Sequence, residues 1–239
     1  MASTAYDNHL AGPHGGHHHH PSMQHQFDSL EQQKESSTLG MWMFLVTEIM
    51  FFGGLFVSYV VYRTKFHEVF ALASSHLDWK LGALNTAVLI ASSLTMAMAI
   101  WAAQVNKRKM IIVFLLLTIV LGSTFLVVKT FEYGDKFEHH LVPGPHFAPD
   151  PEHYGDIVAV SDKAQVFFSL YFIMTGLHAL HMIIGIGVLI WLLFPSWKGK
   201  FDSSYYNPLE VTGLYWHFVD LVWIFLFPLL YLLGAHVHH

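Results

Sequence analysis

The sequence predicts an all-α integral membrane protein, a bundle of five transmembrane helices with a disordered polar N-terminal tail. Of its 239 residues, 54% are hydrophobic and only 12% are charged, about half the charged fraction of a soluble domain. Five stretches are long and apolar enough to cross a bilayer, which needs about 20 residues of helix. Helices are expected rather than strands, because a helix satisfies its own backbone hydrogen bonds in lipid.

Residues 1–37 form the predicted tail, and residues 38–239 form the predicted membrane domain. The tail contains the polar stretch HGGHHHHPSMQHQ, whose composition is typical of disordered segments. Its first 35 residues contain no apolar segment of the kind found in cleavable signal peptides. The four consecutive histidines could bind a divalent transition metal, but a solvated tail with incidental metal affinity is the favoured interpretation.

The five helices are predicted at about 39–62, 81–104, 110–131, 164–194 and 211–235. The fourth is long enough to tilt or to project beyond the membrane, and Pro228 is expected to kink the fifth. Small residues along the second helix and five glycines elsewhere are expected to let helix backbones approach closely. These glycines are Gly53, Gly54, Gly176, Gly185 and Gly187.

Two connections set the expected topology. The turn VNKRK, residues 105–109, joins the second and third helices with three adjacent basic residues, and the positive-inside rule places such a cluster in the cytoplasm. The N-terminus is then cytoplasmic and the C-terminus lies outside. The long loop 132–163 is rich in Pro and Gly, which argues against helix over most of its length.

Composition also excludes several classes of protein. With 12 Lys+Arg against 17 Asp+Glu, the chain lacks the basic balance of a nucleic-acid-binding protein. The sequence contains no Cys, which excludes disulfides, thiolate metal sites and thiol nucleophiles.

Glu48 is the one carboxylate near the centre of the first predicted helix, in WMFLVTEIMFF. A charge at the middle of a bilayer costs roughly 3 kcal/mol or more, so Glu48 is expected to be protonated or paired. His178 or His181 on another helix is the economical partner. A carboxyl in this setting is also a candidate for proton exchange near neutral pH.

Five further polar side chains lie within or beside the apolar segments. His178 and His181, in TGLHALHMIIG, are three residues apart and share a helix face. His217 and Asp220, in WHFVD, have the same spacing and are expected to pair within the fifth helix. Glu132 is expected at the end of the third helix, near an interface. The favoured interpretation is hydrogen bonding that locks helix packing; proton handling comes second, and a metal site, which also uses this spacing, comes third.

Four segments resemble, in order, the signatures of subunit III of the haem–copper cytochrome oxidases. They are GMWMFLVTEIMFFGGLF, LNTAVLIASSLTMAMA, TGLHALHMIIG and YWHFVDLVWIFLFPLLYL, with FEY as a smaller fifth match, and they span nearly all of residues 39–235. The resemblance implies a core subunit of a respiratory oxidase that has no catalytic residue, metal or redox centre of its own. The complex reduces O₂ to water with electrons from cytochrome c and pumps protons.

The resemblance also implies partners and residue roles. Subunits I and II hold the haems and copper, cytochrome c acts on the complex rather than on this chain, and structural phospholipid binds in a cleft of subunit III. The subunit stabilises subunit I and supports proton uptake. Glu48 matches the family's membrane-embedded glutamate. The positions with a mainly structural role in the family are matched by His178, His181, His217, Asp220 and Glu132.

The chain departs from the longer, mitochondrial-type form, which has seven helices, because the first two are missing. Five-helix members are typical of bacterial oxidases, so a bacterial plasma membrane is the expected location. Three alternatives stay open: subunit III of a quinol oxidase, a homologue associated with nitric oxide reductase, and a metal-handling membrane transporter. The transporter is disfavoured because the chain shows no internal repeat and few intramembrane charges.

Overall fold

A computed structural model describes residues 27, 29–145, 147–203 and 205–232 of the chain. Its elements are α1 (Leu30–Lys65), α2 (His67–Ser75), α3 (Trp79–Gln104), α4 (Arg108–Glu138), α5 (Pro151–Val158), α6 (Ser161–Trp197), α7 (Asn207–Phe227) and the π-helical turn η1 (Pro228–Leu232). Five of the helices are long and apolar enough to cross a membrane. The described residues form no β-sheet, so the all-α prediction is confirmed.

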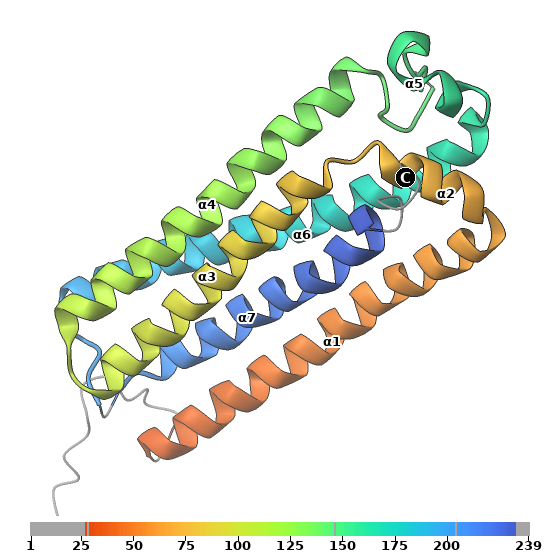
Figure 1. The fold of residues 1–239 in the computed structure, drawn as a ribbon. Helices are drawn as coiled ribbons and strands as arrows, with labels where there is room; N and C mark the ends of the chain where they lie inside the picture. Colours follow the sequence, from red (N-terminus) through yellow and green to blue (C-terminus); the bar gives the residue numbers. More distant parts are fainter. Residues whose placement is uncertain (1–26, 28, 146, 204, 233–239) are drawn as a thin grey trace, which may run out of the picture.

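The five long helices run side by side as one bundle (Figure 1). α3 packs against α4 and α7, α4 packs against α6, and α6 packs against α7. α1 lies along one edge and contacts α7 and α6. Over its most apolar window α7 is 56% buried, whereas α1 is 17% buried. The last helix is therefore the centre of the bundle, and the first is its most exposed member.

The short helices α2 and α5 lie together at one end of the bundle, with the α3–α4 turn at the other end (Figure 1). That turn closes at Asn106, whose φ of 56° lies in the left-handed region, a conformation Asn adopts more readily than most residues. At the α2–α5 end, His76 Nε2 lies 3.1 Å from Asp156 Oδ2. This ion pair joins the end of α2 to α5.

The predicted boundary of the N-terminal tail is wrong by several residues. α1 begins at Leu30, within the segment assigned to the tail, because Ser29 caps it by accepting the Gln32 N–H at 3.1 Å. An ion pair of 2.8 Å between Lys34 and Glu210 then joins this polar first part of α1 to α7. The histidine stretch of the tail lies outside the described residues.

The predicted loop between the third and fourth helices also contains more helix than expected. α4 continues to Glu138 rather than ending near residue 131, and α5 occupies Pro151–Val158. Pro151 stands at the first position of α5, where its missing N–H costs nothing. Helix α2, between the first two predicted spans, was not predicted either. The last predicted helix is α-helical to Phe227 and continues from Pro228 as the π turn to Leu232; the last three residues of the prediction lie outside the described residues.

A single indole ring fills the space at the bundle centre. Trp216 of α7 is fully buried and donates from Nε1 to Ser92 Oγ of α3 at 3.1 Å. A Cβ placed at Gly122 of α4 would lie 2.8 Å from this ring, and one at Gly185 of α6 would lie 3.0 Å from it. Close approach at Gly185 was expected from the sequence, whereas the contact at Gly122 was not.

At the other expected glycines, the described residues show no close approach of a neighbouring helix. A Cβ at Gly53, Gly54 or Gly187 would meet nothing within 4 Å, and one at Gly176 would meet only the Tyr133 hydroxyl, at 3.8 Å. Small residues in the sequence mark possible contacts, but which of them face a neighbour depends on how each helix is rotated in the bundle.

Candidate functional site

Glu48 and His181 face one another between α1 and α6. Glu48 Oε2 lies 3.1 Å from His181 Nε2, and the two side chains are 18% and 13% exposed. The Phe52 ring lies edge-on to the imidazole at 5.3 Å between centroids, and the Tyr215 hydroxyl donates to the His181 carbonyl at 2.9 Å. The structure therefore contains the expected pair of Glu48 with a histidine, and the partner is His181 rather than His178.

The hydrogen bonds of His181 determine where the proton of this pair can sit. His181 Nδ1 lies 2.8 Å from the Leu177 carbonyl oxygen, which can only accept, so Nδ1 carries a hydrogen. Nε2 is left for Glu48. Either the carboxyl donates its hydrogen to a neutral imidazole, or an imidazolium donates to the carboxylate. Both states use the same two atoms, so the pair can hold one exchangeable proton without any movement of α1 or α6.

His178 lies one turn earlier on α6 in a wholly different environment. Its side chain is 1% exposed, and neither ring nitrogen has a hydrogen-bond partner among the described residues. The rings of Phe125 and Trp223 lie 5.3 Å and 5.2 Å from it, centroid to centroid. His178 therefore belongs to the aromatic core and not to the polar network expected from its spacing with His181.

The expected pair of His217 with Asp220 is not formed. His217 Nδ1 instead lies 2.7 Å from Ser93 Oγ on α3, because that hydroxyl faces it directly from the neighbouring helix. Asp220 is 3% exposed. Ser92 lies near its carboxyl group, yet within the described chain neither carboxyl oxygen has a partner with full hydrogen-bond geometry. Both side chains line a groove of about 370 Å³ between α3 and α7.

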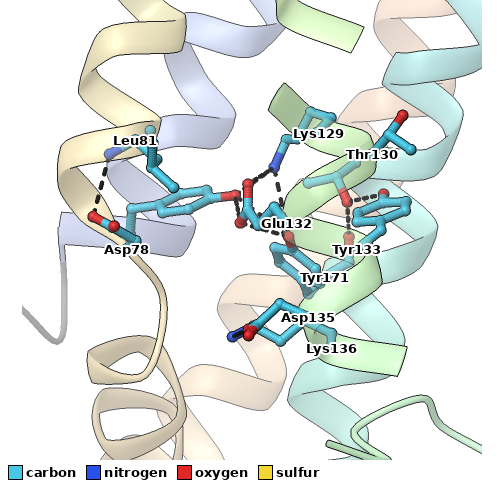
Figure 2. Close-up of polar contacts among 12 residues, drawn as sticks. Asp78, Leu81, Lys129, Thr130, Glu132, Tyr133, Asp135, Lys136 and Tyr171 are labelled. Carbon is cyan, nitrogen blue, oxygen red and sulfur yellow. Dashed lines mark hydrogen bonds and ion pairs between the residues drawn. The ribbon is translucent and has the colours of Figure 1, made fainter. Parts of the chain in front are cut away.

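Glu132 lies in a buried network where α4, α6 and η1 meet. Figure 2 shows the Lys129 ammonium and the Tyr171 hydroxyl converging on its carboxylate. Oε2 accepts from Lys129 Nζ at 2.9 Å, and Oε1 accepts from the hydroxyls of Tyr171 at 2.7 Å and Tyr231 at 2.5 Å. Lys129 also donates to the Tyr231 hydroxyl. With 7% exposure, Glu132 is buried within the bundle, and it lies inside α4 rather than at the end of that helix, which continues to Glu138.

Lys129 is a site residue that the reading of the sequence missed. The signal was its position three residues before Glu132, in KTFE, which places both charges on one face of a helix. Lys136 continues the same buried face at 4% exposure, donating to Asp135 Oδ2 at 2.9 Å and to the Tyr154 hydroxyl at 3.4 Å.

Among the described residues, His181 faces Glu48, His217 faces Ser93 and His178 faces aromatic rings, so these three histidines do not share one set of ligands. In the part of the chain that the structure describes, groups of three side chains with metal-ligand spacing are confined to His139, Asp150 and His153. These residues lie between α4 and α6, outside both helices.

Comparison with known proteins decides the family. The family described as Cytochrome c oxidase subunit III matches residues 24–138 and 151–235, which is most of the chain. The chain belongs to this family. It is thus a subunit III of a terminal oxidase, a multi-pass membrane protein that forms part of a larger complex.

Several relatives within the subunit III family resemble the chain along most of its length. A "Probable cytochrome c oxidase subunit 3" of Nocardia farcinica is 33% identical over 81% of this chain and 86% of its own. A "Probable quinol oxidase subunit 3" of Staphylococcus epidermidis is 28% identical over 87% of this chain and 94% of its own length. A "Cytochrome c oxidase subunit 3" of Thermostichus vulcanus is 28% identical over 86% of this chain and 92% of its own length.

The subunit III membership also separates two kinds of polar residue in the bundle. Glu48, His217, Asp220 and the Lys129–Glu132 pair all fall within the matched ranges. Residues 139–150, which include His139 and Asp150, fall between the two ranges. The polar groups of the membrane helices thus belong to the shared part of the family, whereas the loop groups belong to a segment outside the match.

Proposed function

We propose that this chain is the non-redox subunit III of a bacterial cytochrome c oxidase in the plasma membrane. Subunits I and II hold the haems and copper, and this chain packs against subunit I and stabilises it. The complex passes electrons from cytochrome c to O₂ and translocates protons. The proposal is carried by the family match across both halves of the membrane bundle, together with the similarly named relative at 33% identity.

The side chains of the bundle support a structural role rather than a redox role. Several polar groups of the bundle are paired, as in Glu48–His181 and Lys129–Glu132. Such pairs are expected where helices must be held in register in a medium without water. The sequence also contains no Cys for a thiolate-bound copper centre.

The Glu48–His181 pair supports a part in proton uptake. It holds one exchangeable proton between two atoms 3.1 Å apart, and both side chains are partly exposed at the side of the bundle. In the proposed complex this pair is a proton-holding group beside subunit I. The chemistry of O₂ reduction takes place elsewhere, so the pair supports turnover without being required for it.

Structural phospholipid is the proposed ligand of the apolar surface along α1. The buried residues of this helix are Leu45, Phe52 and Tyr59, which repeat every seventh position and form one narrow stripe. Most of its other large apolar side chains are exposed, including Met50 at 74% and Met43 at 66%. Acyl chains and a neighbouring subunit are the surfaces that match such a face in a membrane.

Subunit III of a quinol oxidase is the second candidate function. The observation in its favour is the resemblance to the Staphylococcus epidermidis relative, which is 28% identical over 87% of this chain. The electron donor binds to other subunits of the complex. The choice between the two donors therefore needs a measurement on the whole oxidase.

Purification of the complex through an affinity tag on this chain tests the proposal. In mild detergent the preparation is expected to show haem absorption and to oxidise reduced cytochrome c faster than a quinol. The opposite preference for the donor would favour the second candidate. Both candidates would be overturned if the chain purifies alone and colourless, with transport activity or bound metal in proportion to the amount of chain.

A further inference from the structure

Three side chains with metal-binding atoms meet where α4 ends and α5 begins. His139 is the C-cap of α4, Asp150 is the N-cap of α5, and His153 lies in the first turn of α5. One ligand atom from each lies within 4.8 Å of the others. His153 Nδ1 and His139 Nδ1 lie 3.0 Å and 4.0 Å from the same oxygen, Asp150 Oδ2. The two imidazole centroids are 5.2 Å apart.

A hydrogen bond at the start of the helix accounts for His153, whose Nδ1 lies 3.0 Å from Asp150 Oδ2, but it does not account for the approach of His139. Asp150 Oδ1 already caps α5 by accepting the Glu152 N–H at 3.1 Å, which leaves Oδ2 for the imidazoles. At 4.0 Å, His139 Nδ1 is too far from Oδ2 for a hydrogen bond. Two imidazole nitrogens thus face one carboxylate oxygen, and only one of them is within hydrogen-bond distance of it.

A second carboxylate lies beside the other nitrogen of His139. Asp135 Oδ1 lies 3.6 Å from His139 Nε2, and Asp135 Oδ2 accepts from the buried Lys136 at 2.9 Å. Histidines that bind metals almost always have such a partner at the second ring nitrogen, which orients the ring and sets its tautomer. The contact with Asp135 is longer than a hydrogen bond, and His139 Nδ1 is the ring nitrogen that lies toward Asp150.

We propose that His139, Asp150 and His153 bind one divalent transition-metal ion of the Zn²⁺ type. Two imidazole nitrogens and one carboxylate oxygen form a donor set that Zn²⁺ accepts, with bonds of about 2.0–2.2 Å that place tetrahedral ligand atoms about 3.3 Å apart. The observed separations of 3.0 Å and 4.0 Å lie on either side of that distance. The His153 side chain is 62% exposed, so water has access as a fourth ligand.

The site belongs to a segment outside the family match. Residues 139–150 separate the two matched ranges, and they carry two of the three ligands. A bound ion would join the end of α4 to the start of α5 across the loop between them. The inference concerns this loop alone and stands independently of the proposed electron donor and of the part proposed for Glu48.

Zinc content of the purified full-length protein, in its membrane complex, tests the inference. In every variant His17–His20 of the tail are replaced by Ser, so that metal bound by the tail does not mask the site. After chelator treatment and re-equilibration with Zn²⁺ alone, the parent with the tail replacement only is expected to retain one more zinc ion per protein than His139→Gln or His153→Gln. His67→Gln is the matched control, because it removes an exposed histidine from neighbouring α2, and it should retain the parent's zinc.

A further variant separates loss of the ligand from loss of the loop structure. Asp150→Asn keeps a good helix N-cap but replaces the carboxylate with a neutral amide. It is expected to lose the zinc equivalent while its thermal midpoint without zinc equals that of the parent. Equal zinc in the parent and all three ligand variants would overturn the inference. Loss of zinc from His67→Gln would also overturn it. So would an X-ray absorption spectrum at the zinc edge of the parent that shows no imidazole ligand.

Discussion

Lys129 and Glu132 form an ion pair that aromatic side chains enclose. Lys129 Nζ lies 4.8 Å from the centre of a Trp223 ring, and the hydroxyls of Tyr171 and Tyr231 occupy the second carboxylate oxygen. In such a place each charge is stabilised chiefly by its partner. Removal of one partner leaves an uncompensated charge away from water, which is far more costly than removal of both.

Lys129→Met is therefore expected to destabilise the protein by about 3–5 kcal/mol, because it removes one partner of a buried ion pair. The measurement is the midpoint of thermal dissociation of the purified complex. The double variant Lys129→Met/Glu132→Gln should recover most of the loss, since it buries no net charge. Additive losses in the double variant would contradict this account of the pair.

Glu48→Gln tests whether the proton between Glu48 and His181 is required for turnover. A glutamine amide can donate to His181 Nε2 over the same 3.1 Å, so α1 and α6 should remain in contact. We expect assembly and most of the O₂ reduction rate to persist. Loss of all activity in a fully assembled variant would make Glu48 an obligatory proton carrier. An infrared carboxyl band that vanishes in the variant would identify the protonated state of Glu48 in the parent.

Asp220→Asn tests the carboxyl group that has no partner with full hydrogen-bond geometry within the described chain. An amide of the same shape can still accept from Ser92, and it removes the cost of burying an ionisable group. The thermal midpoint of the complex is therefore expected to be unchanged or higher. A fall of several degrees would show that a donor from another subunit or a lipid reaches into the groove between α3 and α7.

At the scale of the elements, the distance between neighbouring helices depends on where a large side chain of one helix packs against a glycine of another. Trp216 places its ring against Gly122 of α4 and Gly185 of α6 while its Nε1 donates to Ser92 of α3. One residue of α7 therefore sets the spacing of three neighbours. Since α7 is also the most buried span, the packing of the whole bundle depends on this ring.

Gly122→Ala and Gly185→Ala are each expected to cost about 1–3 kcal/mol, because an added methyl group would overpack against the Trp216 ring. Gly187→Ala is the matched control: it lies on the same helix as Gly185, and its Cβ would meet nothing within 4 Å. The control should be neutral or slightly stabilising, since Ala favours helix over Gly. Thermal dissociation of the assembled complex measures all three, and equal effects at the three glycines would contradict the packing account.

The five spans and the need of Glu48 for a histidine partner could be predicted from the sequence, because hydropathy and the cost of a buried charge act locally along the chain. The short helices α2 and α5 could not, since they are too short for a span and depend on contacts such as His76–Asp156. The choice of Ser93 over Asp220 as the partner of His217 depends on how α3 and α7 are rotated. Spacing within one helix carries no information about that rotation.

On the scale of the whole molecule, the two ends of the bundle differ in charge and in structure. One end carries the basic α3–α4 turn, with Lys107, Arg108 and Lys109 in succession. The other end carries α2 and α5, with the ion pair His76–Asp156 and the cluster of His139, Asp150 and His153. If the basic end is cytoplasmic, as the positive-inside rule predicts, the α2–α5 end faces the outside, where extracellular metal ions can reach it.

Single cysteines can determine this orientation, because the sequence contains no Cys that would react in the background. Gln104→Cys lies at the exposed end of α3 and leaves the basic cluster intact, whereas Asp162→Cys lies at the exposed start of α6, at the opposite end. In intact cells, a membrane-impermeant maleimide is expected to label Asp162→Cys and to leave Gln104→Cys unmodified until the membrane is permeabilised. The reverse pattern would invert the topology, and it would place the cluster of His139, Asp150 and His153 in the cytoplasm. The labelling therefore decides from which side of the membrane an ion would enter that site.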